Sequence, residues 1–222
     1  HIQRAAGLVP HESKPFAVSI TEITESGVLY TIDEIKAISS VAHKNGLKVH
    51  MDGSRFANAL AALDCTPSEL SWKAGVDVIS LGGTKNGCLL AELIIFFDDT
   101  INTDNFGYML KRSGQLLSKS RFFSAQFIAY FQDNLWIENA RNANNMAKKI
   151  AEFLLVIPGS SLITPVDGNE VFVKLPSEAA RFLKDNGIVF GVWDVEFTQF
   201  RLLASWNTTI EDVNILKEKV EL

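Results

Sequence analysis

The chain has 222 residues, of which 47% are hydrophobic and 21% charged, so it can bury a sizeable core and lacks the composition of a disordered chain. A net charge of −5 disfavours a strongly basic nucleic-acid-binding surface. No apolar run reaches the roughly 18 residues of a membrane-spanning helix. The two cysteines, Cys65 and Cys88, are too few for a disulfide framework. Together with an N-terminus that lacks a signal-peptide core, they favour a cytoplasmic protein without membrane or nucleic-acid partners.

The first half of the chain alternates short apolar runs with helical patterns. Thr31 and Glu34 have the spacing of a capping box, which predicts a helix that ends at Asn45-Gly46. Thr66-Pro67 predicts a second, shorter helix start, and residues 55–63 favour another helix. Strands are expected at residues 16–20, 47–51, 76–81 and 92–97. Strands that alternate with helices indicate an α/β fold with a mostly parallel sheet.

The second half follows a different pattern. A long helical region is expected from residue 121 to residue 156, with a break or bend at Asn134 or Asn139. Pro158-Gly159 then interrupts the chain. Beyond it the pattern predicts strands at residues 162–166, 170–175, 188–193 and 200–206, and helices at residues 177–186 and 209–220. The sequence therefore predicts a small C-terminal α+β domain that begins near Pro158.

A carboxylate and a guanidinium directly follow the strand expected at residues 47–51. The segment reads Asp52-Gly53-Ser54-Arg55. In a parallel α/β sheet, ligands bind at the carboxyl ends of the strands, so Asp52 lies where a ligand could meet it. A simpler interpretation is that Asp52 caps the helix that begins near Arg55.

A glycine-rich turn follows the next strand. It reads Gly82-Gly83-Thr84-Lys85-Asn86-Gly87 and is not a P-loop, because Asn86 stands where that motif requires Ser or Thr. A lysine that is partly desolvated in such a turn has a lowered pKa and can act as a nucleophile. The simpler interpretation is a surface lysine in a glycine turn.

Asp52 and Lys85 together indicate more than either residue alone. Each follows one of two successive strands, and a carboxylate and a lysine in this arrangement are what pyridoxal phosphate (PLP) requires. The lysine binds the aldehyde of PLP as a Schiff base, and the carboxylate keeps the pyridine nitrogen protonated.

The chain resembles low-specificity L-threonine aldolases, which are PLP enzymes of the aspartate aminotransferase fold. The resemblance runs from about Lys14 to the C-terminus. It is carried by residues 19–22 (SITE), 24–30 (TESGVLY), 50–59 (HMDGSRFANA), 72–77 (WKAGVD), 82–87 (GGTKNG) and Arg201-Leu202.

The resemblance implies a set of cofactor-binding residues and no metal site. Lys85 would be the Schiff-base lysine, and Asp52 would pair with the pyridine nitrogen. Arg55 would lie near the 3′-oxygen of the cofactor, and Thr84 would belong to the same site. One basic residue of Lys111-Arg112 would reach the PLP phosphate of a neighbouring subunit, although two solvated charges explain that pair equally well.

The resemblance also implies the substrate site. Arg201, with Arg55, would bind the substrate carboxylate through a planar, two-pronged guanidinium. Glu25 stands near the place where related aldolases have a histidine, so its carboxylate would serve as the catalytic base or organise the loop. The family's alanine before the arginine is Ser54 here, and the histidine of its Gly-His pair is Gln115.

By the same resemblance, residues 1–157 would form the large PLP-binding domain and residues 158–222 the small domain. The family's N-terminal segment, with its phosphate-binding turn and a stacking aromatic residue, would be missing. His1 to Ser13 contain no glycine-rich phosphate turn, and His1 and His11 are expected to be solvated tail residues. The short chain is therefore expected to associate and to cleave little threonine.

The implied activity is that of a PLP-dependent aldehyde-lyase, which cleaves threonine or another β-hydroxy-α-amino acid to glycine and an aldehyde. Two alternatives remain open. The Asp–Lys–Arg set also serves β-eliminating lyases and aminotransferases, and a chain without its N-terminal segment could instead persist as a non-catalytic oligomerising module. Because the family's sites lie between subunits, a homodimer or homotetramer is expected.

Overall fold

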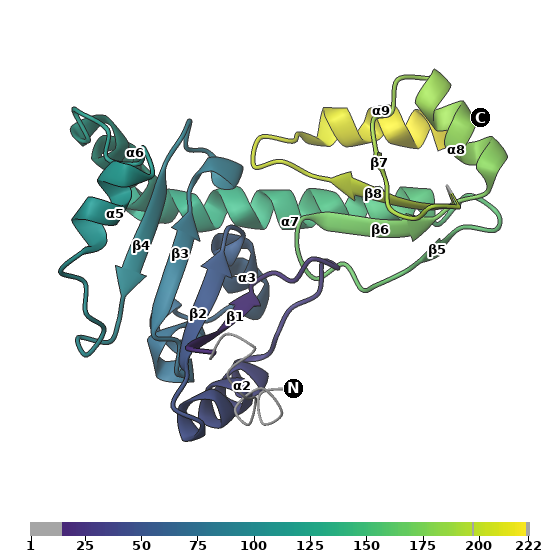
Figure 1. The fold of residues 1–222 in the computed structure, drawn as a ribbon. Coiled ribbons are helices and arrows are strands. Elements are labelled where there is room, and N and C mark those ends of the chain that lie inside the picture. The colour runs from purple at the N-terminus through teal and green to yellow at the C-terminus, as the bar shows by residue number, and fades with distance from the viewer. Residues whose placement is uncertain (1–14, 197, 221–222) are drawn as a thin grey trace.

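A computed structural model describes residues 15–196 and 198–220 of the chain (Figure 1). These residues form two four-stranded sheets, and one long helix, α7 (Leu135–Leu154), runs alongside both. No helix in the described part of the chain combines the length and the apolar character needed to cross a membrane. His1 to Ser13, which carry the expectations about the N-terminal tail, lie outside the described residues.

The first sheet consists of the four strands expected in the first half. They are β1 (Ala17–Thr21), β2 (Lys48–Gly53), β3 (Val78–Gly82) and β4 (Glu92–Phe96), in that order across the sheet. β1 and β2 pair in parallel, as do β2 and β3, whereas β4 is antiparallel to β3. The prediction of one mostly parallel sheet is therefore confirmed.

One face of this sheet is buried beneath helices. The helices are α2 (Ile32–Lys44), α3 (Phe56–Leu63) and α4 (Pro67–Leu70), followed by the 3-10 turn η1 (Trp72–Ala74). The predicted capping box of Thr31 is present, and Thr66 forms another that starts α4 with its proline in the first turn. Alternate residues of the strands, among them Val49, Met51 and Ile79, point into the core and are at most 1% exposed.

The long helical region is broken, as expected. It consists of α6 (Arg121–Phe131), the turn η3 (Gln132–Asn134) and α7, and it follows the short helix α5 (Phe106–Arg112). Asp133 and Asn134 adopt positive φ values of 51° and 59°, which interrupt the helix. Asn139 causes no second break. It lies inside α7 and donates from Nδ2 to the backbone oxygen of Asn86 at 3.0 Å.

The second sheet is antiparallel and is shorter than the sequence indicates. Its strands are β5 (Ser161–Leu162), β6 (Glu170–Lys174), β7 (Gly191–Val192) and β8 (Gln199–Leu203), in the order β5-β6-β8-β7. The expected strands at 162–166 and 188–193 were too long. Pro165 cannot donate to a strand ladder, and Val189 is 91% exposed while Ile188 and Phe190 pack as loop residues.

Helices α8 (Ser177–Asp185) and α9 (Ile210–Val220) pack with the second sheet. Trp136 and Ala140, near the start of α7, belong to the core of the first sheet. Residues from Met146 to Leu154 belong to the core of the second. Because α7 contributes to both cores, the division of the chain into residues 1–157 and 158–222 stays a prediction.

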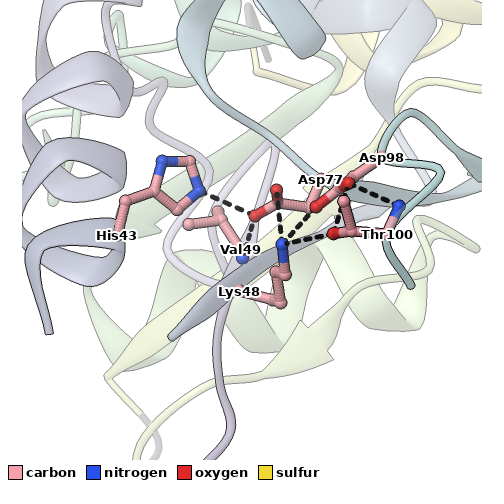
Figure 2. A network of polar contacts seen from close by, with 6 residues as sticks. All are labelled: His43, Lys48, Val49, Asp77, Asp98 and Thr100. Atoms are coloured by element: carbon pink, nitrogen blue, oxygen red, sulfur yellow. Dashed lines mark hydrogen bonds and ion pairs between the residues drawn. The ribbon is translucent and has the colours of Figure 1, made fainter. Parts of the chain in front are cut away.

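At the amino ends of β2 and β3, a polar network ties the first sheet together. Figure 2 shows its members: His43, Lys48, Val49, Asp77, Asp98 and Thr100. Asp77, which is 8% exposed, accepts from Nε2 of His43 at 2.8 Å and from the backbone N–H of Val49 at 2.7 Å. Lys48 donates to Asp98, and its Nζ lies 3.9 Å from Oδ1 of Asp77. The network joins the end of α2 to β2 and to the segments that flank β3 and β4.

Candidate active site

The predicted site residues lie at the opposite end of the first sheet, where β2 and β3 end and the second sheet begins (Figure 1). Lys85 is the middle residue of the 3-10 turn η2 (Thr84–Asn86), directly after β3. A Cβ atom at Gly82 would lie 2.9 Å from the Cα of Ser54, so only glycine lets β3 end this close to the turn after β2.

This close approach places the Lys85 amine against the turn after β2. Its Nζ donates to Oγ of Ser54 at 3.0 Å. Burial lowers the pKa of Lys85, and the positive charges of Arg55 and Arg201 lower it further. The carboxylates of Asp52 and Glu170 act in the opposite direction. An amine with a lowered pKa is unprotonated more often at neutral pH, which makes Lys85 a better nucleophile than a solvated lysine.

Asp52 does not cap the helix that follows it. Its Oδ1 accepts from the backbone N–H of Ser54 at 2.9 Å, whereas α3 has Arg55 at its N-cap position and no side-chain cap. The simpler interpretation of Asp52 is therefore wrong, because the carboxylate forms a tight turn that keeps it at the end of β2.

A row of side chains precedes Asp52 on the same face of the sheet. His50 lies two residues before it and hydrogen-bonds through Nδ1 to Oγ of Ser19 at 2.8 Å. Through Nε2, His50 hydrogen-bonds to Oγ of Ser80 at 2.9 Å. These bonds link β1, β2 and β3 beside the candidate site and so fix the strand ends relative to one another.

Two arginines, one from the turn after β2 and one from β8, meet on one buried carboxylate. Oε1 of Glu170 accepts from Nε of Arg201 at 2.7 Å and from Nη2 of the same guanidinium. The Nη2 of Arg55 lies 3.3 Å from this oxygen, and Nε of Arg55 donates to Oδ1 of Asn169 at 3.1 Å. Burial lowers the pKa of Arg55, and the charge of Glu170 opposes that shift. Asn169 and Glu170 therefore position both guanidinium groups.

The structure brings together four of the predicted site residues: Asp52, Arg55, Lys85 and Arg201. Glu25 is exposed in the loop between β1 and α2, and its charge acts on Arg55. Thr84 points elsewhere, because its hydroxyl donates to Oε1 of Glu92 at 2.8 Å. Lys111 and Arg112 are exposed at the end of α5. The functional roles of all these residues stay predictions.

Sequence analysis missed Asn169 and Glu170. A signal was present, because Asn-Glu directly precedes the apolar run Val171-Phe172-Val173 of a buried strand. Charged residues are rarely fully buried unless they are paired, so a glutamate at the start of such a strand predicts a cationic partner. The partner itself could not be predicted, because Arg55 lies 115 positions earlier in the chain.

The donor set fits a cofactor that carries an aldehyde and a basic ring nitrogen. Lys85 offers an amine with a lowered pKa, and Asp52 offers a carboxylate within the same cluster of charges. Of the part of the chain that the structure describes, no group of three or more His, Cys, Asp or Glu side chains is arranged to hold a metal ion. The amine of Lys85 and the carboxylate of Asp52 are themselves suited to organic cofactor chemistry.

Comparisons with known proteins point in the same direction. The chain is 44% identical over 212 residues to a low specificity L-threonine aldolase from Pseudomonas aeruginosa, covering 96% of this chain and 61% of that protein. It is 43% identical over 198 residues to a protein of the same name from Pseudomonas sp., covering 89% of this chain and 57% of that protein. The structure matches a threonine aldolase from Leishmania major with a TM-score of 0.86 and 27% identity, covering 96% of this chain and 62% of that one.

The chain thus spans between 57% and 62% of the length of these relatives. A family model described as beta-eliminating lyase matches residues 1–178. Because this match covers well over half of the sequence, the chain belongs to the beta-eliminating lyase family.

Proposed function

We propose that this protein is a PLP-dependent aldehyde-lyase that cleaves L-threonine or another β-hydroxy-α-amino acid to glycine and an aldehyde. The observation that carries the proposal is the Lys85 amine, whose pKa is lowered and which lies among the charges of Asp52, Arg55 and Arg201. The relatives named as threonine aldolases support the choice of reaction.

In this proposal, two residues hold the cofactor. Lys85 supplies the amine that attaches its aldehyde, and Asp52 supplies the carboxylate that keeps its ring nitrogen protonated. Bound PLP supplies an electron sink for the breaking Cα–Cβ bond. Thr84 would contact the cofactor through its backbone, or through its hydroxyl once the hydrogen bond to Glu92 is broken.

The arginines would bind and orient the substrate. Within residues 15–196 and 198–220, no acceptor engages the Nη1 group of Arg55 or of Arg201, so both can donate to a substrate carboxylate. A carboxylate held at two points fixes the orientation of the bonds at Cα. Glu25, whose charge reaches Arg55, would accept the proton of the β-hydroxyl.

The experiment incubates the chain with PLP, reduces it with borohydride and locates the adduct by mass spectrometry. An adduct on Lys85, together with a detectable but slow release of glycine and acetaldehyde from L-threonine, is the expected result. An adduct on another lysine would contradict the assignment of Lys85. Attachment without cleavage would contradict the aldolase reaction of this chain while leaving the cofactor site in place.

The family description favours one second candidate, a β-eliminating lyase, because the same lysine, carboxylate and arginines serve both reactions. The products separate the two. β-Elimination of threonine releases ammonia and 2-oxobutanoate, whereas the aldolase reaction releases glycine. An aminotransferase would require a 2-oxo acid. We also propose a homodimer or homotetramer, which light scattering tests, and the cytoplasmic location stays a prediction.

A further inference from the structure

The carboxylate of Glu170 is almost completely buried beside the candidate site. The side chain of Glu170 is 2% exposed, compared with 13% for Arg55 and 29% for Arg201. It stands at the start of β6 in the second sheet, whereas Arg55 belongs to the turn between β2 and α3. Its Oε1 nevertheless accepts two hydrogen bonds from Arg201 and forms an ion pair with Nη2 of Arg55 at 3.3 Å. A buried carboxylate is stable only when it is paired, and these two guanidinium groups are its partners.

The surroundings of Glu170 fix this arrangement. Asn169 donates from Nδ2 to the backbone oxygen of Ala204 at 2.8 Å, and its Oδ1 holds Nε of Arg55. The guanidinium of Arg201 lies 5.8 Å from the centre of the Phe172 ring. Phe172 in turn packs against Gly27, where a Cβ atom would lie 2.7 Å from the ring. Each guanidinium is therefore held at a defined place with its Nη1 group left for a ligand.

The charges of the three side chains do not cancel. Two guanidinium groups and one carboxylate leave a single net positive charge at the position proposed for the substrate carboxylate. One ligand carboxylate neutralises that charge. Once the Lys85 amine holds the cofactor, neither arginine has charge left for a second carboxylate on the same ligand, and that carboxylate would meet the negative charge of Glu170.

We propose that Glu170 is a specificity-determining residue that restricts this site to ligands with a single carboxylate. The inference rests on the proposed function, because it assigns the ligand of Arg55 and Arg201 as an amino-acid carboxylate. Glu170 touches the two arginines and acts through them on the ligand. It selects amino acids with an uncharged β-hydroxyl side chain over those that carry a second acidic group.

The test uses the chain without cofactor and with the Lys85 amine acetylated, so it depends neither on the aldolase reaction nor on the charge of that lysine. Phenylglyoxal modifies accessible arginines, and mass spectrometry measures its reaction with Arg201. Propionate and succinate serve as ligands with one and two carboxylates. In the native chain, propionate is expected to protect Arg201 at a lower concentration than succinate. The E170Q variant removes the negative charge and keeps the shape, so the preference is expected to shift towards succinate by at least about tenfold.

A second measurement follows the pKa of the Lys85 amine through the pH dependence of its acetylation. Because the charge of Glu170 raises this pKa, E170Q is expected to lower it. The control is E178Q, which removes an exposed carboxylate of α8 and should change neither the preference nor the pKa. An E170Q chain that keeps the native preference within about threefold overturns the proposal.

Circular dichroism shows whether E170Q folds. If it does not, the E170D variant provides the test. The aspartate retains the charge but is one methylene shorter, so it holds the arginines less well. The preference for propionate should persist while both ligands protect less strongly. Loss of the preference in a folded E170D chain overturns the proposal as well. Failure of the aldolase assay alone leaves these measurements intact and contradicts only the proposed reaction.

Discussion

At the amino ends of β2 and β3, each charged group has a partner of opposite charge, whereas at the carboxyl ends burial leaves charged groups only partly compensated. In the amino-end network, the hydrogen bond from Lys48 lowers the pKa of Asp98, and the same bond raises the pKa of Lys48. At the other end of the sheet, burial lowers the pKa of Lys85 and raises that of Glu22 to about 8. At the amino end the pKa of the lysine rises and that of the carboxyl group falls, whereas at the carboxyl end the pKa of the lysine falls and that of the carboxyl group rises.

Two buried carboxylates show the cause. Both accept a backbone N–H, Asp77 from Val49 at 2.7 Å and Glu22 from Tyr30 at 3.2 Å. Asp77 also contacts His43, but Oε1 of Glu22 has no hydrogen-bond partner among the described residues. Burial favours the neutral form of Glu22, and a single backbone hydrogen bond opposes this only in part, so its pKa is raised. The amino end is therefore suited to stability and the carboxyl end to chemistry.

The largest expected effect is that of Lys85→Ala on cofactor attachment. Borohydride reduction should give no stable adduct with PLP, because the attaching amine is gone. The free energy of unfolding should change by less than about 0.5 kcal/mol, since the side chain is only partly buried and, among the described residues, hydrogen-bonds only to Ser54. Lys73→Ala, which removes another exposed lysine, should keep the adduct. A reducible adduct in the Lys85 variant would show that the chain uses a different amine.

At the amino end, Asp77→Ala should act on stability and spare the site. Its removal leaves the N–H of Val49 and the partly exposed side chain of His43 without their acceptor. Hydrogen bonds to a charged group contribute about 1.5–3 kcal/mol each, so the loss of both should cost about 3–5 kcal/mol. The urea midpoint should fall at an unchanged m-value, and PLP should still attach to Lys85. Asp33→Ala is the control, because its ion pair with Lys36 is exposed and contributes less than about 1 kcal/mol. If a folded Asp77→Ala chain no longer attached PLP, the amino end of the sheet would also serve the cofactor site, and the proposed division between the two ends would be wrong.

The sequence predicted the elements whose signals are local. Thr31 with Glu34 and Thr66 with the proline after it gave the correct helix starts, because a cap depends on residues within one turn. The strands of the first sheet were also predicted, since each is a short, mostly apolar segment between helical patterns. β5 and β7 were overextended, because apolar residues such as Ile188 pack in loops as well as in strands. Hydrophobic periodicity does not distinguish an apolar loop from a strand.

For the candidate site, residue identities could be predicted and contacts could not. Asp52 and Lys85 stood out because each follows a strand, and the order of strands in a parallel sheet brings their ends together. The carboxylate that joins Arg55 to Arg201 depends on how the second sheet packs against the first. That packing is set by α7, whose apolar residues serve both cores, and no local pattern encodes it.

The carboxyl group of Glu22, at the carboxyl end of the sheet, should make the free energy of unfolding depend on pH. Its pKa is about 8 in the folded chain, against an ordinary value of 4.5. Between these values the unfolded chain has released the proton and the folded chain retains it, so the stability contributed by Glu22 falls as pH rises from 4.5 to about 8. Below this window both states are protonated, and above it the penalty is constant. At about 1.4 kcal/mol per pKa unit, the full penalty is roughly 5 kcal/mol.

Glu22→Gln should remove this pH dependence. At pH 9 the variant should be more stable than the native chain by roughly 2–4 kcal/mol, because the buried amide group offsets part of the gain. At pH 5 it should be no more stable. Urea titrations at both pH values measure the difference, with Glu178→Gln as an exposed control. An equal pH slope in the Glu22→Gln and native chains would show that Glu22 is ionised in the folded chain.

Arg201→Lys tests whether Arg201 binds the substrate carboxylate or only pairs with Glu170, and its expected effect is small. Lysine keeps the positive charge but lacks the planar guanidinium, in which Nε and Nη2 hold Glu170 and a third nitrogen, Nη1, can donate to a ligand. Arg201→Lys should therefore weaken amino-acid binding to the PLP-loaded chain by roughly 1–3 kcal/mol, as measured by spectral titration. Cofactor occupancy should change little, because Lys85 and Asp52 remain. Arg181→Lys, on the exposed face of α8, is the control. If affinity is unchanged while the urea midpoint falls, Arg201 serves as the structural partner of Glu170 and not as the carboxylate ligand.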